Sequence, residues 1–220
     1  MFTHLSERLP ELVEALWETA TMVGIATASA LLLGLPLGTL MYLSRRGGLR
    51  EHAALCAAVN SVVNLIRSFP FLILLVALIP VTRFLLGTSL GTVAASVPLA
   101  VAAVAYYSRL SEQSLLEVDA GVIEAATALG ATVREILFKV VFVEALPGLL
   151  LGLTISIVSF ISYSTLAGAV GGGGIGDFAI RYGYYRFETD VMVTTMAIIA
   201  VIVQAVQFGG GRLSRRFDKR

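Results

Sequence analysis

The sequence is poor in the residues that build most enzyme active sites and metal centres. It contains one cysteine, Cys56, and two histidines, His4 and His52, in 220 residues. A single cysteine can form neither a disulfide within the chain nor a cluster of thiolate ligands, and the histidines lie far apart in the sequence. The sequence also lacks a nucleophile elbow, a zinc-protease helix and a GxxxxGK[ST] phosphate loop. We therefore expect no catalytic residue and no metal site.

Charged residues are scarce as well. They make up 14% of the chain, against 57% hydrophobic residues, whereas soluble domains carry about 25% charged residues. One soluble core of this size cannot bury so much apolar surface. The composition predicts a membrane protein whose surroundings are a lipid bilayer, and we expect no nucleic acid among its partners.

Five runs are apolar and long enough to cross a bilayer, which takes about 20 residues. They are uniformly apolar and do not alternate with polar residues, so we expect helices rather than the strands of a barrel. The expected spans are residues 19–43, 53–79, 90–108, 146–170 and 191–208. The predicted fold is therefore an all-α polytopic membrane protein with five transmembrane helices.

The positions of lysine and arginine predict the orientation. The loop 44–52, the segment 109–141 and the tail 209–220 together hold eleven of these residues, and the opposite side holds four. This bias predicts an extracellular N-terminus and a cytoplasmic C-terminus. Residues 109–141, between spans three and four, would face the cytoplasm, and residues 209–220 would form a basic cytoplasmic tail.

Residues 1–18 precede the first span and do not read as a secretory signal, because they carry four glutamates and only one arginine. Leu5, Leu9, Leu12 and Leu16 recur at helical spacing. We expect an amphipathic helix on the outer membrane surface. The alternative is a simple outward extension of the first span. Residues 19–208 would then form the transmembrane domain.

The segment 109–141 carries two consecutive helix signals. Asp119 can cap a short helix that Gly130 ends, and the spacing of Thr132 and Glu135 is typical of a capping box that opens a second helix. A passive connecting loop, which is the alternative, needs neither signal. The first helix would offer a partner a small apolar surface together with one charge, that of Glu124. The residues expected at this contact are Glu124, Ala125, Ala126, Leu129 and Gly130.

Polar residues at helical spacing within two spans suggest a pathway through the membrane. Arg67 is the strongest candidate, because an arginine at membrane depth is costly unless it faces a cavity or a partner. Leu166 would form an apolar gate near the outer end. Ordinary hydrogen bonding and packing between helices is the alternative. The candidate pathway residues are Asn60, Asn64, Arg67, Ser68, Ser159, Ser162, Tyr163 and Leu166.

The run GGGGIGDF, residues 171–178, superficially suggests a nucleotide loop. No strand precedes it, no Lys-Ser or Lys-Thr pair follows it, and the topology places it outside. We expect instead a tight reversal of the chain and a surface for an external protein, with an interfacial aromatic belt as the alternative. The expected contact residues are Gly171, Gly172, Gly173, Gly174, Asp177, Arg181 and Tyr184.

Several of these motifs resemble one known family. Glu124-Ala125-Ala126, followed after three residues by Gly130, resembles the EAA loop of ATP-binding-cassette importer permeases. The family's Leu-Pro pair is missing where it would align, at Phe142 and Val143, although EALPGLLLG at 144–152 resembles the family's continuation. Other stretches are similar to methionine importer permeases; these are RSFPF at 67–71, ISYSTLAGAVGGGGIGD at 161–177, RYGY at 181–184 and the ending DKR.

The resemblance implies a type I importer fold and a function. A bacterial inner-membrane permease of this family works as two copies with two ATPase subunits, which bind ATP and magnesium, so this chain would hold no cofactor. An external methionine-binding lipoprotein would deliver D- or L-methionine. The EAA loop would form the coupling helix that docks on the ATPase, and transport would proceed by alternating access.

Three alternatives remain open. A permease of the same class could carry another small amino acid or a peptide. An ion-coupled secondary transporter would usually show two related halves and buried carboxylates, whereas we expect no acidic residue well inside a span. A membrane-anchored scaffold would use residues 109–141 for docking without transport, and the polar residues of the spans argue against it.

Overall fold

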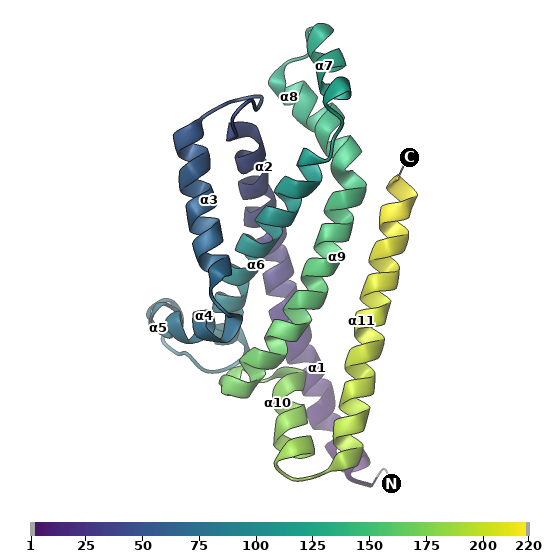
Figure 1. Ribbon diagram of the computed structural model, residues 1–220. Coiled ribbons are helices and arrows are strands. Elements are labelled where there is room, and N and C mark those ends of the chain that lie inside the picture. Colours follow the sequence, from purple (N-terminus) through teal and green to yellow (C-terminus); the bar gives the residue numbers. More distant parts are fainter. Residues whose placement is uncertain (1–2, 219–220) are drawn as a thin grey trace.

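The computed structural model describes residues 3–218, with side chains from residue 7 onward. The described residues form helices joined by short turns, without any strand, and the long helices run side by side in an elongated bundle (Figure 1). Helices α7 and α8 stand at one end of this bundle and α10 at the other. We call these the α7 end and the α10 end.

The first helical stretch comprises α1 (Thr3–Ser29), a π-helical turn (Ala30–Gly34) and α2 (Leu35–Ser44). Pro36 lies just after the π-helical turn, inside this continuous stretch. The part that qualifies as a membrane span, Glu7–Ser44, has 38 residues and is about 57 Å long, whereas the hydrocarbon core is about 30 Å thick. No break separates residues 3–18 from the span, so the described part of this region has the form of the alternative, an extension of the first span.

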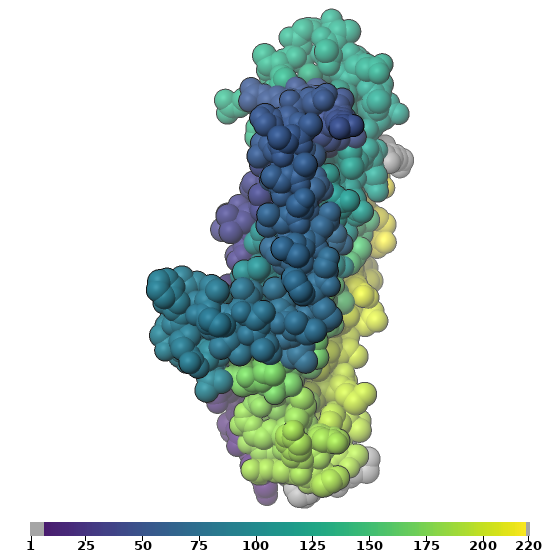
Figure 2. All heavy atoms as spheres, turned by 60° about the vertical axis from the view of Figure 1, so that its left-hand side comes forward, coloured from purple at the N-terminus to yellow at the C-terminus, as the bar shows by residue number. Residues whose placement is uncertain are grey.

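The second span is bent. Helix α3 (Ala53–Ser68) and α4 (Phe71–Ala77) meet at 104°, and α5 (Ile79–Leu86) follows. The expected span 53–79 is therefore divided into two helices at Pro70. Pro70 lacks an N–H and forces Phe69 into extended backbone, with φ −87° and ψ 134°. As a result α4 and α5 project to one side of the bundle (Figure 2).

Helix α6 (Thr92–Leu116) lies at the centre of the bundle. It packs against α1, α2 and α9, and its Leu99 and Tyr107 are fully or almost fully buried beside Met22 and Phe160. The expected third span ended at residue 108, but the helix continues for two more turns. Arg109 therefore lies within α6 rather than in the connecting segment, which begins only after Leu116.

Between α6 and the next long helix lies α7 (Ala120–Ala128). Helix α8 (Val133–Glu135) continues through a π-helical turn (Ile136–Val141) into α9 (Phe142–Ala167) and a terminal turn (Gly168–Gly172). The expectation of a second, separate short helix in the connecting segment is thus wrong. It is the beginning of one continuous stretch, Val133–Gly172, which runs through Pro147 without a break.

The last elements are α10 (Gly174–Phe178), a π-helical turn (Ala179–Tyr184) and α11 (Thr189–Phe217). Most of the expected tail 209–220 is therefore helical. The glycines at 209–211 lie within α11. A Cβ on Gly210 would lie 2.0 Å from Oγ1 of Thr154. Glycine lets α11 approach α9 at this point, and Ser214 donates a hydrogen bond of 2.9 Å to the carbonyl of Pro147.

Four helical stretches in the described residues are long and apolar enough to span a membrane, and the bent pair α3–α4 makes a fifth. The four are Glu7–Ser44, Thr92–Leu116, Val133–Gly172 and Thr189–Phe217. With the bent pair counted as one span, the all-α fold with five spans is confirmed.

Candidate functional site

The segment from Asp119 to Lys139, which we call the coupling segment, is shaped by its own caps. The Asp119 carboxylate accepts a hydrogen bond of 2.7 Å from the Gly121 amide, and Gly130 ends α7 with φ +80°. Thr132 and Glu135 form the predicted capping box, with bonds of 3.3 Å from the Glu135 amide to the Thr132 hydroxyl and 3.1 Å in return. These predictions are confirmed.

Helix α7 has no buried residue among its nine. Glu124, Ala125 and Val122 are exposed, and Leu129 is 89% exposed. The sequence placed Ala126 on the same outward side, but it is half-buried and packs against the bundle. The apolar surface that α7 offers a partner is therefore formed by Val122, Ala125 and Leu129, at helical spacing.

The inner side of α7 rests on the ends of two long helices. Ile123 and Ala126 pack on a buried cluster that includes Leu115 near the end of α6 and Ile136 and Val141 at the start of the α8–α9 stretch. Only three residues, 117–119, connect α6 to α7. A displacement of α7 would therefore reach both α6 and α9 through packed side chains and short covalent links.

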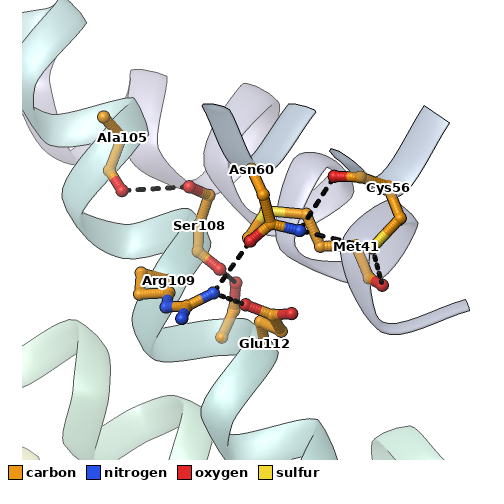
Figure 3. Close-up of polar contacts among 8 residues, drawn as sticks. Met41, Cys56, Asn60, Ala105, Ser108, Arg109 and Glu112 are labelled. Atoms are coloured by element: carbon orange, nitrogen blue, oxygen red, sulfur yellow. Dashed lines mark hydrogen bonds and ion pairs between the residues drawn. The ribbon is translucent and has the colours of Figure 1, made fainter. Parts of the chain in front are cut away.

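A buried polar cluster joins α3 to α6 (Figure 3). The guanidinium of Arg109 donates to the Asn60 amide oxygen at 3.0 Å and to the Glu112 carboxylate at 2.6 Å. Asn60 also donates to the Cys56 carbonyl at 2.9 Å. The Glu112 side chain is only 8% exposed, and it lies four residues before the end of α6, not well inside a span. Asn60 acts as a contact between helices, which was the alternative for this residue.

The other polar candidates do not converge on one site. Asn64 and Ser68 are exposed, and the Ser68 hydroxyl donates to the Asn64 carbonyl at 2.7 Å. The hydroxyls of Ser159 and Ser162 donate to carbonyls of their own helix, at 3.0 and 3.3 Å. Leu166 is exposed near the α10 end of α9. None of these five residues lines the cavity described next.

The structure does bring Arg67 and Tyr163 together, in a cavity of about 130 Å³ that we call the Arg67 cavity. The Phe71 ring stacks on Tyr163, with centroids 4.7 Å apart and planes 11° apart. Phe71 and Tyr106 were not predicted from the sequence, although the Pro70 in RSFPF was a signal that the chain turns there. The lining residues are Ile66, Arg67, Phe69, Phe71, Leu74, Ala102, Tyr106 and Tyr163.

The glycine run mainly serves packing inside the chain. The Glu18 carboxylate of α1 accepts a 2.6 Å hydrogen bond from the Gly174 amide and a 3.1 Å bond from the Thr92 hydroxyl. Gly173 has φ +72°, and a Cβ there would lie 2.5 Å from Glu18. Gly172 and Gly174 are buried. The expectation that these two glycines contact an external protein is therefore wrong.

The remaining residues predicted at the α10 end are accessible. Arg181 pairs with Asp177 one turn earlier, and Tyr184 is exposed together with Tyr185 and Phe187. This surface combines charges with exposed aromatic rings, as protein contacts do. In the described part of the chain, no group of His, Cys, Asp and Glu side chains could hold a metal ion.

Comparison with known proteins gives the family. Residues 30–220 match the family described as binding-protein-dependent transport system inner membrane component. The chain is 47% identical over 209 residues, 95% of its length, to a probable D-methionine transport system permease protein of Vibrio cholerae, covering 93% of that relative. It is 40% identical to the methionine import system permease protein of Bacillus subtilis, covering 96% of both chains.

The fold agrees. A crystal structure described as an inward-facing conformation of the MetNI methionine ABC transporter superposes with a TM-score of 0.93 at 41% identity, covering 97% of this chain and 99% of that one. Both the sequence match and this likeness extend over the coupling segment and the long helices that carry it. The chain therefore belongs to the family of binding-protein-dependent transport system inner membrane components.

Proposed function

We propose that this chain is the membrane-spanning permease subunit of an ATP-driven importer that moves methionine across the bacterial inner membrane. The observation that carries the proposal is the coupling segment, an exposed, doubly capped helix seated on the ends of α6 and α9. A chain of this family without a phosphate-binding loop needs a partner to hydrolyse ATP. The coupling segment provides a rigid surface for such a partner.

The proposed assembly contains two copies of this chain and two ATPase subunits, which bind ATP and magnesium. The ATPase docks on Val122, Ala125 and Leu129, and Glu124 offers a carboxylate to a basic residue of the partner. The α7 end and the C-terminus then face the cytoplasm, and the N-terminus faces outside. When the ATPase subunits close, they move the coupling segments together, and α6 and α9 tilt with them.

The substrate enters at the α10 end, where an external methionine-binding lipoprotein docks on Asp177, Arg181 and Tyr184, beside Gly171 and Gly173. The substrate then passes the Arg67 cavity and the stripe of Ser159, Ser162 and Leu166, with Leu166 as an apolar gate. Asn64 and Ser68 lie on the exposed side of α3 next to Arg67 and belong to the same path.

Methionine, as the D- or the L-isomer, is proposed as substrate because the relatives from Vibrio cholerae and Bacillus subtilis are named for its transport. A permease of this class for another small amino acid or a peptide is the second candidate. An ion-coupled transporter would need a carboxylate free to bind the ion. Glu112 does not serve this need, because Arg109 pairs with it at 2.6 Å.

Reconstitution into liposomes tests the proposal. The chain, its ATPase and the binding protein should together take up methionine only when ATP is supplied. Leu129→Asp should abolish association with the ATPase and reduce uptake more than tenfold while leaving the folded permease intact, because the Leu129 side chain contacts solvent. Leu213→Asp, on exposed α11 near the same end, is the matched control and should retain uptake.

Other outcomes identify the alternatives. Uptake driven by an ion gradient without the ATPase would indicate a secondary transporter, and ATPase binding without any uptake would indicate a scaffold. Delivery of another ligand by the binding protein would replace methionine while leaving the permease role in place.

A further inference from the structure

Arg67 lies in the last turn of α3, within a span, and the described residues give its charge no acidic partner. The ion pairs of the described residues involve Arg8, Arg109, Lys139 and Arg181, not Arg67. Its guanidinium interacts electrostatically with the phenol of Tyr163. A guanidinium offers five N–H donors, and at membrane depth an unpaired one is costly. An anion bound beside it would remove that cost.

The surroundings of Arg67 divide into a polar and an apolar part. Arg67 with the phenols of Tyr106 and Tyr163 forms the polar part, while Phe71, with its ring stacked on Tyr163, contributes to an apolar wall. The remaining wall is aliphatic or aromatic; it consists of Ile66, Phe69, Leu74 and Ala102. This is the common pattern of a small-molecule site, in which a few polar groups orient a ligand within an apolar cavity.

The bend between α3 and α4 creates this arrangement. Arg67 is in the last turn of α3, and Phe71 is the first residue of α4, so the 104° turn at Pro70 folds the aromatic ring back toward the bundle. Tyr106 reaches the cavity from α6 and Tyr163 from α9. The cavity is thus built by four helices, including the two on which the coupling segment rests.

We propose that the Arg67 cavity is a binding site for one free α-amino acid with an apolar side chain, whose carboxylate is held by the Arg67 guanidinium. The inference rests on the proposed function, because it assigns a substrate site within that pathway. Arginine suits this role, since its fork of donors matches a carboxylate with two parallel hydrogen bonds. The side chain of the ligand lies against Phe71 and Tyr163, where a thioether gains favourable sulfur–aromatic contacts.

The size and charge of the cavity restrict the ligand. A volume of about 130 Å³ is close to that of an apolar cavity of about 150 Å³ that holds benzene, so the cavity suits the side chain of one amino acid. Among the described residues that line the cavity there is no carboxylate to receive an ammonium group. Recognition therefore depends on the carboxylate and the apolar side chain, and the ammonium group meets only phenol oxygens.

Equilibrium binding tests the proposal directly. The probe is radiolabelled L-methionine, added to the purified permease–ATPase complex in lipid nanodiscs without the external binding protein. The wild type should bind saturably, and Arg67→Gln should weaken binding roughly ten- to a hundredfold, the effect of losing a charge-assisted hydrogen bond. Arg67→Lys, which keeps the charge but loses the fork, should fall between the two.

Two controls make the result specific. Arg83→Gln removes an exposed arginine of α5 that bonds only to the Ser89 hydroxyl among the described residues and should bind as the wild type does. Competition on the wild-type complex needs no variant at all. Norleucine, which keeps the carboxylate and the length of the side chain, should displace methionine, whereas methionine amide, which lacks the carboxylate, should not.

The proposal is overturned if Arg67→Gln and the wild type bind equally, if methionine amide competes as well as norleucine, or if the wild-type complex binds no methionine. Uptake assays on the same complexes, reconstituted into liposomes with the binding protein and ATP, separate this failure from failure of the proposed function. ATP-dependent methionine uptake with equal binding by both proteins would refute only the cavity. Absence of uptake by the wild type would refute the permease role.

Discussion

The coupling segment and the bundle beneath it are held together in different ways. The side-chain bonds of the coupling segment join residues at most four positions apart, such as Asp119 with Gly121 and Glu135 with Lys139. The bundle has, besides such local bonds, side-chain bonds between distant residues, which join Asn60 to Arg109, 49 positions away, and Glu18 to Gly174, 156 positions away. A locally capped segment keeps its shape while the helices below it move, which suits a part that transmits displacement. The bundle depends instead on a few distant polar contacts, and substitutions should therefore cost more there.

The largest cost should follow from breaking the polar cluster between α3 and α6. Arg109→Leu leaves Glu112 buried without its partner, and such a loss costs about 3–5 kcal/mol. Thermal unfolding of the purified permease, followed by circular dichroism, would measure it. Because Asn60 loses the same partner, the contact between α3 and α6 should also weaken.

A double variant provides the control for this prediction. Arg109→Leu combined with Glu112→Leu removes both charges, and replacing a buried ion pair by apolar residues is often close to neutral. We expect the double variant to recover most of the stability lost in Arg109→Leu. Equal losses in the single and double variants would show that packing, rather than the unpaired carboxylate, is responsible.

The second largest cost should appear at the α10 end. Glu18→Ala removes the acceptor of the Gly174 amide and of the Thr92 hydroxyl, and a buried donor without a partner costs about 1–3 kcal/mol. Hydrogen exchange should then increase at the Gly174 amide. Glu14→Ala, an exposed glutamate one turn earlier, is the matched control and should leave exchange at α10 unchanged. Protection of Gly174 that survives Glu18→Ala would contradict the prediction.

The difference between local contacts in the coupling segment and distant contacts in the bundle also explains which features the sequence could predict. The caps of the coupling segment depend on neighbouring residues. Their spacing was therefore enough to predict the capping roles of Asp119, Gly130, Thr132 and Glu135. The span count depended on hydrophobic runs and was also correct. The role of the glycine run was not accessible, because the carboxylate that meets Gly174 comes from Glu18 in the first helix.

The Arg67 cavity was only half predictable for the same reason. An arginine inside an apolar run signals a cavity or a partner, and Arg67 was found in this way. Phe71 and Tyr106 carry no such signal, since aromatic residues in a span usually pack against lipid or other helices. Their convergence follows from the bend at Pro70, whose angle no local pattern specifies.

Within the coupling segment the expected effects are smaller. Thr132→Ala removes the hydroxyl that accepts from the Glu135 amide, and loss of an N-cap costs about 1 kcal/mol. Faster hydrogen exchange at Glu135 and Ile136 would reveal it. Thr127→Ala also removes an exposed threonine hydroxyl, which bonds to the Ile123 carbonyl and caps nothing, and should have less effect. If the two variants behave alike, the capping box does not hold the start of α8.

The smallest expected effect is a response of the capping box of Thr132 and Glu135 to pH. Bonds from the Lys139 ammonium and from the Thr132 amide and hydroxyl hold the pKa of Glu135 at about 2, below its ordinary 4.5. Because the folded value is the lower one, the ionised carboxylate contributes its full stabilisation above about pH 4.5 and loses it progressively as the pH falls toward 2. Carboxyl carbon-13 NMR on glutamate-labelled protein should therefore find Glu135 still ionised at pH 3. In Lys139→Gln the strongest of these bonds to the carboxylate is lost, so Glu135 should take up its proton at higher pH than in the wild type. An unchanged titration in that variant would mean that Thr132 alone sets the pKa.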